Sequence, residues 1–295
     1  MIEKRTTSRV IFNIFNYGFM ALVCIVCVAP LWHVFMSSFS NPRMLMAKGG
    51  LAWLPVGTPT LNGYQLVFKN PSIFTGYANT LLYVTLTTLL GTTLTTVAGF
   101  VLSRATKLRK PLTIFVLFTM MFSGGLIPSF MINLKLGLVN TRLAILIPGV
   151  INAFYIIIMK SAFEQLPSSF EESAKLDGAS PLTIMVRILV PLVKATLAVV
   201  AMFTVVQQWN SWFQASIYLQ KRRDLWPLQL YMREILVQND TARILTSTDA
   251  QAKANMTNNL VKYCVTIVGT LPILLVYPFA QKYFVTGVTL GGVKG

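Results

Sequence analysis

Long runs without a charged residue divide this chain. Six such runs, from 17 to 34 residues long, occupy 10–42, 70–103, 111–134, 143–159, 195–220 and 263–281. A helix needs roughly 17–25 apolar residues to cross a hydrocarbon layer of about 30 Å, and backbone amides in lipid must find partners within their own segment. The pattern therefore predicts an all-α membrane protein with six transmembrane helices, at about 11–36, 77–103, 111–132, 143–160, 192–213 and 261–281.

Two stretches need separate interpretation. The uncharged stretch 49–68 is expected to be a loop, because Pro55, Gly57 and Pro59 interrupt it. The first predicted span follows a basic N-terminus, as a secretory signal would. Its apolar run far exceeds the 7–15 residues of a signal core, so we expect an uncleaved membrane anchor.

Composition supports a membrane protein. The mean hydropathy is +0.63, 54% of residues are apolar and 12% are charged, against roughly 25% charged in a typical soluble protein. The net charge of +16 would suggest nucleic acid in a soluble chain, whereas here it indicates basic loops beside anionic lipid headgroups, and no nucleic-acid partner is expected. Three Cys and one His supply neither a disulfide framework nor a metal site.

Orientation is only weakly marked. Six spans put both termini on one side, with 13 Lys and Arg residues on that side and 12 on the other. The positive-inside rule barely separates the two orientations, although four cations crowd the short turn 104–110. We expect a multi-pass protein of the bacterial cytoplasmic (inner) membrane with both termini, including the tail 282–295, in the cytoplasm.

The polar insert 164–191 between the fourth and fifth predicted spans has the pattern of two short helices joined by a bend. Ser168 with Glu171 three residues later predicts a capping box at the start of the first helix. Gly178 suits the left-handed residue that ends it, and Pro191 is expected to break the second helix. We name this insert the elbow. It is either an ordinary surface loop or a surface for docking another protein.

The elbow resembles the signature of ABC importer permeases, Glu-Ala-Ala-x3-Gly-x9-Ile-x-Leu-Pro. The matching residues are Glu172-Ser-Ala174, Gly178 and Ile188-Leu-Val-Pro191, with Ser173 and Val190 as mild departures. The segments 122–128, 209–212 and 282–295 look like the carbohydrate-uptake, maltose-type branch. Within that branch the chain is similar to the second permease of the heterodimer.

The resemblance implies a fold, partners and roles. The elbow would be a coupling helix docked on an ATP-hydrolysing subunit, and the tail would reach between two ATP-binding subunits. The chain has no Gly-x4-Gly-Lys-Ser/Thr phosphate loop. It would therefore bind no cofactor and be a non-catalytic subunit, with ATP and Mg used by those partners. A homologous second permease and an extracytoplasmic solute-binding protein complete the assembly. The implied coupling residues are Glu171, Glu172, Ala174, Asp177, Gly178, Ile188 and Pro191, and the implied tail residues are Gly291, Gly292 and Lys294.

The extracytoplasmic loop 214–260 begins with three adjacent cations, Lys221, Arg222 and Arg223. Apolar residues at helical spacing, Leu228 and Tyr231 among them, predict a helix over 225–245. Such a helix could lie on the membrane surface. By resemblance, the loop would instead touch the solute-binding protein, and its cations would suit an acidic partner or an acidic sugar.

Polar residues at the end of the fifth predicted span suggest a substrate path. Amides offer donors and acceptors for sugar hydroxyls, and aromatic rings cover the CH face of a sugar. Trp212 is equally well explained as a membrane-interface residue. The candidate path residues are Asn152, Tyr155, Gln207, Gln208, Trp209, Asn210 and Trp212.

Two functions follow as hypotheses. The first is a permease subunit of a binding-protein-dependent ABC importer, moving a sugar or oligosaccharide inward by ATP-driven alternating access; an acidic oligosaccharide would suit its basic outer side. The alternative is a stand-alone, ion-coupled secondary transporter of a small polar solute. That class calls for ionisable residues at mid-membrane and often for internal repeats, and the sequence has neither.

Overall fold

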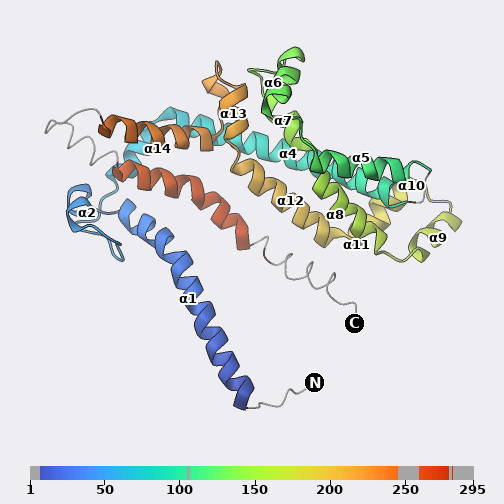
Figure 1. Cartoon of the computed structure of the whole chain (residues 1–295), viewed down its shortest axis with the longest axis horizontal. Coiled ribbons are helices and arrows are strands. Elements are labelled where there is room, and N and C mark those ends of the chain that lie inside the picture. The colour runs from blue at the N-terminus through green and yellow to red at the C-terminus, as the bar shows by residue number, and fades with distance from the viewer. Residues whose placement is uncertain (1–6, 105–106, 245–258, 279–280, 282–295) are drawn as a thin grey trace. The chain divides into compact units, whose positions relative to one another are not determined.

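The computed structural model describes residues 7–104, 107–244, 259–278 and 281, and those ranges contain helices and no strand (Figure 1). The sequence predicts a single domain over 1–295. That prediction stays untested, and the chain divides into two compact units, Met1–Asn70 with Met232–Thr270 and Pro71–Tyr231 with Leu271–Gly295.

Four helices are long and apolar enough to cross a membrane: α1 (Thr7–Ser38), α4 (Pro71–Ser103), Leu143–Glu164 and Asn259–Pro278. Two bent helix pairs raise the number to as many as six if each pair is one span. The apolar runs of the sequence thus correspond to helices, and two of the six spans are not straight.

The first unit contains α1, α2 (Pro42–Lys48) and α3 (Asn62–Lys69). In α1, no residue of the most apolar stretch is buried, so its surface is available to lipid or to another protein. The stretch 49–68, expected to be a loop, contains most of α3. The backbone amide of Ala52 donates to His33 Nδ1 at 2.9 Å, which ties this stretch to the end of α1.

In the second unit, α4 packs against α7 (Leu143–Val150), α8 (Ala153–Glu164) and α12 (Lys194–Trp209). Two glycines of α4 allow the neighbouring helices to approach it closely. A Cβ on Gly91 would lie 2.7 Å from the carbonyl oxygen of Val150, and one on Gly99 would lie 2.7 Å from Cβ of Met159. Small residues at such contacts let membrane helices approach closely.

The predicted span 111–132 is wrong as a single helix. It consists of α5 (Arg109–Met121) and α6 (Leu126–Lys135), bent by 113°. Gly125 lies between them with φ of 83°, a conformation that glycine adopts without strain. An uncharged run indicates that a segment is apolar but does not predict where the segment bends.

The predicted span 192–213 also needs correction, because its helix α12 ends at Trp209 and the chain bends by 84° at Val193. The preceding helix passes through Pro191, which was expected to break it, and ends one residue later at Leu192. Residues Ile184–Leu189 are π-helical, and the Val190 amide donates to the carbonyl of Met185, five residues back. Pro191 has no backbone N–H, so this stretch lacks one hydrogen-bond donor. The local π-helical hydrogen bonds pair the remaining backbone groups differently.

The loop 214–260 is mostly helical where it is described. It contains α13 (Phe213–Tyr218), the 3₁₀ turn η2 (Arg223–Leu225) and α14 (Leu228–Ile244), so the helix predicted over 225–245 is confirmed. The first turn of α14 is buried against α4: a Cβ on Gly76 would lie 3.0 Å from Cα of Leu228. Protein, rather than lipid, covers this turn.

Two apolar clusters form the core of the second unit. One joins the N-terminal part of α4 to α7, α13 and the turn after it, and consists of Tyr83, Ala144, Ile145, Leu146, Ala215, Tyr218, Leu219, Leu225 and Leu230. The other joins the elbow to α8 and α12, and consists of Met159, Phe163, Ala174, Ile184, Leu189, Val193 and Val200. The two clusters support two polar regions at different points along α4.

Candidate functional site: elbow, cavity and outer platform

The elbow folds as two helices joined at a glycine. Its first helix, α9 (Ser169–Leu176), ends in a left-handed Gly178 with φ of 76°. The Gly178 amide donates to the carbonyl of Lys175, and the Ala179 amide to that of Ala174, both at 3.0 Å. These two bonds form a Schellman motif, so the expectation for Gly178 is confirmed.

The capping box expected at Ser168 and Glu171 is wrong. Ser168 has helical backbone angles and its side chain makes no capping hydrogen bond. Glu171 turns toward α4 instead, where its carboxylate lies 2.6 Å from Nη2 of Arg104. An ion pair with a residue distant in sequence has displaced the local bond that the spacing predicted.

The predicted coupling residues fall into two groups. Ala174 and Glu171 are buried, and Ile188 is half-buried. Glu172, Asp177, Gly178 and Pro191 are exposed. Leu176, which the motif does not include, is 90% exposed on the same helix. The elbow thus presents two carboxylates beside an apolar side chain on its outer surface, while its inner face is packed into the protein.

A cavity of about 340 Å³ lies along α4 between α7 and α12 and brings together five of the seven predicted path residues. They are Asn152, Gln207, Gln208, Asn210 and Trp212. The Tyr155 hydroxyl reaches the set by donating to Gln207 Oε1 at 3.1 Å. Trp209 does not line the cavity; it is buried and packs against Tyr77.

Sequence reasoning missed several polar residues that line the same cavity. Thr87 comes from α4, Thr204 from α12, and Ser211 and Gln214 from the segment after α12. Thr87 belongs to a threonine-rich helix, a pattern that indicates close packing as readily as a polar path. Gln214 could have been found by its position two residues beyond Trp212. The cavity is therefore lined mainly by amides and hydroxyls.

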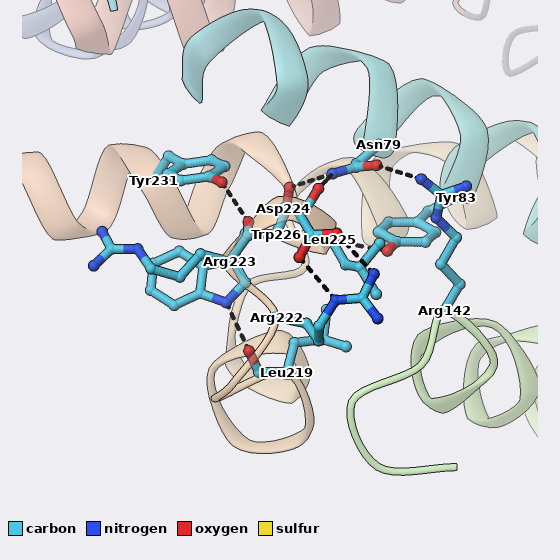
Figure 2. Close-up of polar contacts among 10 residues, drawn as sticks. All are labelled: Asn79, Tyr83, Arg142, Leu219, Arg222, Arg223, Asp224, Leu225, Trp226 and Tyr231. Carbon is cyan, nitrogen blue, oxygen red and sulfur yellow. Dashed lines mark hydrogen bonds and ion pairs between the residues drawn. The ribbon is translucent and has the colours of Figure 1, made fainter. Parts of the chain in front are cut away.

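The three predicted outer cations lie on a turn that is held firmly against α4 (Figure 2). Asn79 Nδ2 donates to the carbonyls of Asp224 and Trp226, at 2.7 and 3.1 Å. The Tyr83 hydroxyl donates to the carbonyl of Leu225 at 2.8 Å. Arg142 Nη2 donates to Asn79 Oδ1 at 3.2 Å. We name this turn, residues 219–226, the outer platform.

Further bonds fix the ends of the outer platform. Trp226 Nε1 donates to the carbonyl of Leu219 at 2.9 Å, and the guanidinium of Arg223 lies over the Trp226 ring, 4.7 Å from its centroid. The Lys221 amide donates to Oδ1 of Asn140, a residue with left-handed φ of 62°. Short-range and long-range bonds thus hold the same eight-residue turn in a single conformation.

One cation of the platform is neutralised. Arg222 makes a bidentate pair with Asp224, at 2.9 and 2.8 Å (Figure 2). The hydrogen bond from Arg222 lowers the pKa of the Asp224 carboxyl below its usual value. Both side chains are largely exposed, so the pair orders the surface and adds no net charge to it.

The elbow and the outer platform lie at opposite ends of α4. Asn79 holds the platform, and Arg104, directly after the helix, contacts the elbow. At 1.5 Å per residue, the 25 residues between them span about 37 Å, more than the roughly 30 Å of a hydrocarbon core. Thr87 of the cavity lies between the two.

Other predicted residues lie outside the described ranges. The tail residues Gly291, Gly292 and Lys294 are among them. Within the described ranges, no group of three or more His, Cys, Asp or Glu side chains is placed to hold a metal ion.

Apolar helices long enough to cross a membrane, with a polar cavity along one of them, are features typical of a transport permease. Comparison with known families agrees. Residues 91–290 match the family described as the binding-protein-dependent transport system inner membrane component, and the chain belongs to that family. It is therefore a permease subunit of an ABC importer, which decides against the stand-alone secondary transporter.

Relatives cover the full length of the chain. It is 34% identical over 291 residues to the polygalacturonan/rhamnogalacturonan transport system permease protein YtcP of Bacillus subtilis, which covers 97% of this chain and 99% of that protein. It is 29% identical to the lactose transport system permease protein LacG of Rhizobium radiobacter, covering 98% and 99%.

A solved structure is also similar. It is a bacterial ABC transporter involved in the import of the acidic polysaccharide alginate, with a TM-score of 0.84 and 29% identity over 96% of this chain and 99% of that one. The permease fold expected from the sequence is thereby confirmed.

Proposed function

We propose that this chain is one of two homologous permease subunits that together carry a sugar or oligosaccharide through the bacterial inner membrane into the cytoplasm. Two ATP-binding subunits use ATP and Mg, and this chain binds neither. An extracytoplasmic solute-binding protein delivers the substrate. A fold relative, 15% identical, comes from an alginate ABC transporter in complex with an alginate pentasaccharide-bound periplasmic protein.

The separation of the elbow from the outer platform along α4 carries the proposal. A docking surface for ATP-binding subunits and one for a solute-binding protein must lie on opposite sides of a membrane. The distance of about 37 Å between Asn79 and Arg104 meets that requirement. On this arrangement the elbow and both termini are cytoplasmic, and Lys221, Arg222 and Arg223 face outward.

Each of the three regions has a distinct task. Glu172, Asp177 and the exposed Leu176 contact an ATP-binding subunit, whose closure moves the elbow. The tail residues Gly291, Gly292 and Lys294 extend that contact between the two ATP-binding subunits. The cavity passes the substrate along α4 by alternating access. The outer platform receives the loaded solute-binding protein.

The substrate we favour is an acidic oligosaccharide. Two relatives handle acidic chains, polygalacturonan/rhamnogalacturonan and alginate. Of the described residues that line the cavity, none is Asp or Glu, so nothing on this wall repels a uronate carboxylate. Its amides, Gln207 and Gln208 among them, can donate to hydroxyl and carboxylate oxygens alike.

Cysteine labelling tests the orientation. Cys24, Cys27 and Cys264 are first replaced by Ser, and a single cysteine is then placed at Leu176 or Lys221. A membrane-impermeant maleimide should label Lys221→Cys in intact spheroplasts and Leu176→Cys only after permeabilisation. The reverse pattern would overturn the assignment of the two sides.

Co-purification tests the docking role of the elbow. Glu172→Lys should reach the membrane but lose association with the ATP-binding subunits, because a charge-assisted contact at a partly desolvated interface is worth about 2–5 kcal/mol. Gln220→Lys, the same gain of a cation at the opposite end of α4, should retain those subunits. Normal transport by Glu172→Lys would remove the coupling role.

Uptake by the complete transporter in proteoliposomes tests the substrate class. A labelled trigalacturonate should be taken up in preference to a neutral trisaccharide when each is supplied with the loaded solute-binding protein. A preference for the neutral sugar would refute the acidic substrate and leave the importer function intact.

A further inference from the structure

We propose that Glu171 is a positioning residue that ties the elbow to α4 through Arg104, so that movement of the docked elbow is transmitted to the helix that lines the substrate cavity. The proposal rests on the docking role given above to the elbow. It concerns the neighbour of Glu172 rather than Glu172 itself, and we name the pair of Arg104 and Glu171 the clamp.

The clamp is a close and largely buried ion pair. Arg104 Nη2 lies 2.6 Å from Glu171 Oε1, and the two side chains are 25% and 12% exposed. The guanidinium also lies over the ring of Phe100, 5.0 Å from its centroid. Phe100 in turn packs edge-on against Phe163 of α8. Arg104 thus lies between a ring and a carboxylate.

The two adjacent glutamates point in different directions. Successive residues of an α-helix are rotated by about 100°, so one can face the protein while the next faces away. Glu171 is buried toward α4, whereas Glu172 is exposed. The first turn of α9 therefore carries one carboxylate for an external partner and one for the permease itself.

The part of the elbow after Ser168 also packs against α8 through apolar side chains. Ala174, Ile184 and Leu189 of the elbow pack with Met159 and Phe163 of α8. Apolar contacts are non-directional and allow sliding, whereas a buried ion pair specifies one partner and one separation. The clamp is thus the contact that fixes where α9 sits along α4.

A second ion cluster lies nearby and has a different role. Lys160 Nζ donates to both carboxylate oxygens of Glu164, at 2.9 and 3.0 Å, and Arg109 contacts the same carboxylate. Glu164 is the first residue of the elbow but also the last residue of α8, so this cluster joins α5 to α8 and does not involve α9. Among the described residues, the ion pair between α4 and α9 is therefore supplied by the clamp.

Space beside the clamp allows it to respond to movement. A cavity of about 630 Å³ is lined by Arg104, Glu171, Glu172 and Lys175, together with Arg109 and Ser168. Side chains can rearrange into this cavity without displacing the apolar core. Thr87 of the substrate cavity lies on α4, which ends at Ser103, directly before Arg104; the 17 residues from Thr87 to Arg104 correspond to about 25 Å along the axis. Displacement of the clamp reaches the substrate through one continuous helix.

The experiment measures ATP hydrolysed per sugar transported by the complete transporter in proteoliposomes. Glu171→Gln and Arg104→Gln should retain the ATP-binding subunits, because Glu172 is unchanged, while the ratio rises about five- to tenfold, the size of a typical coupling free energy. Glu171→Asp keeps the charge but shortens the side chain, and should give an intermediate ratio. Exchange of the two charges, Arg104→Glu with Glu171→Arg, should lower the ratio again toward the wild-type value.

Lys175→Gln is the matched control. Lys175 is on the same helix, 63% exposed, with its Nζ 3.7 Å from Glu171 Oε2, so its replacement should change the ratio by less than about twofold. A wild-type ratio in both Glu171→Gln and Glu171→Asp would overturn the clamp, as would an exchange variant no better than either single one. Retention of the ATP-binding subunits by Glu172→Lys would instead refute the docking role of the elbow, a separate result.

Discussion

The outer platform offers a graded test of how α4 holds this turn in place. Asn79→Leu keeps the side-chain volume but removes two donated bonds, to the carbonyls of Asp224 and Trp226, and the acceptor of Arg142. Asn79 is buried, so both carbonyls lose their donor in a place that water reaches poorly. Each such loss costs about 1–3 kcal/mol. We expect Asn79→Leu to destabilise the platform by about 2–6 kcal/mol.

Tyr83→Phe is a smaller perturbation of the same platform. It removes one hydrogen bond, to the carbonyl of Leu225, and should cost about 1 kcal/mol. Since 1.4 kcal/mol is a factor of ten, opening of the platform should increase roughly 30-fold or more in Asn79→Leu and about fivefold in Tyr83→Phe. Both variants should also bind the solute-binding protein more weakly.

Hydrogen exchange followed by mass spectrometry on the assembled transporter in nanodiscs measures this opening. The amides of Arg222, Leu225 and Trp226 donate to carbonyls within the platform, so they have protection to lose. Peptides from α8 serve as an internal control and should exchange as in the wild type. Wild-type exchange of 219–226 in Asn79→Leu, or a larger effect from Tyr83→Phe, would refute this account of the platform.

Three further predictions concern packing, capping and pH. Gly99→Ala should lower the stability of the transporter in detergent by about 1–3 kcal/mol, because the new Cβ would lie 2.7 Å from Met159. Gly18→Ala, whose added atom meets nothing within 4 Å, should leave the stability unchanged, and equal melting curves for the two variants would contradict the close contact between Gly99 and Met159. Thr80→Val removes the hydroxyl that accepts the first amide of α14 at 2.8 Å and should cost about 1–2 kcal/mol in the same assay; no loss would show that the amide finds another acceptor. Because Arg222 lowers the pKa of Asp224, protection of the platform from hydrogen exchange should stay constant above the usual Asp pKa of about 4. It should be lost only as the pH falls through the lower pKa of the folded protein. Asp224→Asn should abolish this loss at low pH, and an unchanged loss in that variant would assign it to another group.

The sequence predicted where apolar helices occur better than how they run. Charge-free runs identified the four described helices that are long and apolar enough to cross a membrane, because a charge in lipid is costly at any position. The same runs could not reveal the 113° bend at Gly125 or the 84° bend at Val193. A bend depends on which neighbours satisfy the freed backbone groups, and those neighbours are distant in sequence.

The candidate site shows the same division. Local patterns predicted the left-handed Gly178 and the helix α14, since each depends on residues a few positions apart. The platform bond from Asn79 to the carbonyl of Asp224 joins residues 145 positions apart, and the backbone carbonyl that accepts it leaves no mark in the sequence. Arg104 likewise displaced the capping box expected at Glu171, a competition that only the folded chain makes visible.

The bend at Val193 has a consequence for the size of the movement that the proposed coupling requires of the elbow. The twelve residues of Pro181–Leu192 form an arm roughly 18 Å long, set at 84° to α12. Rotation of α12 by about 10° about that junction would sweep the far tip of the arm through about 3 Å, a simple lever estimate from that length. Conversely, a displacement of a few ångströms at the tip of the arm corresponds to a small tilt of α12. Packed helices can follow a tilt of that size without separating.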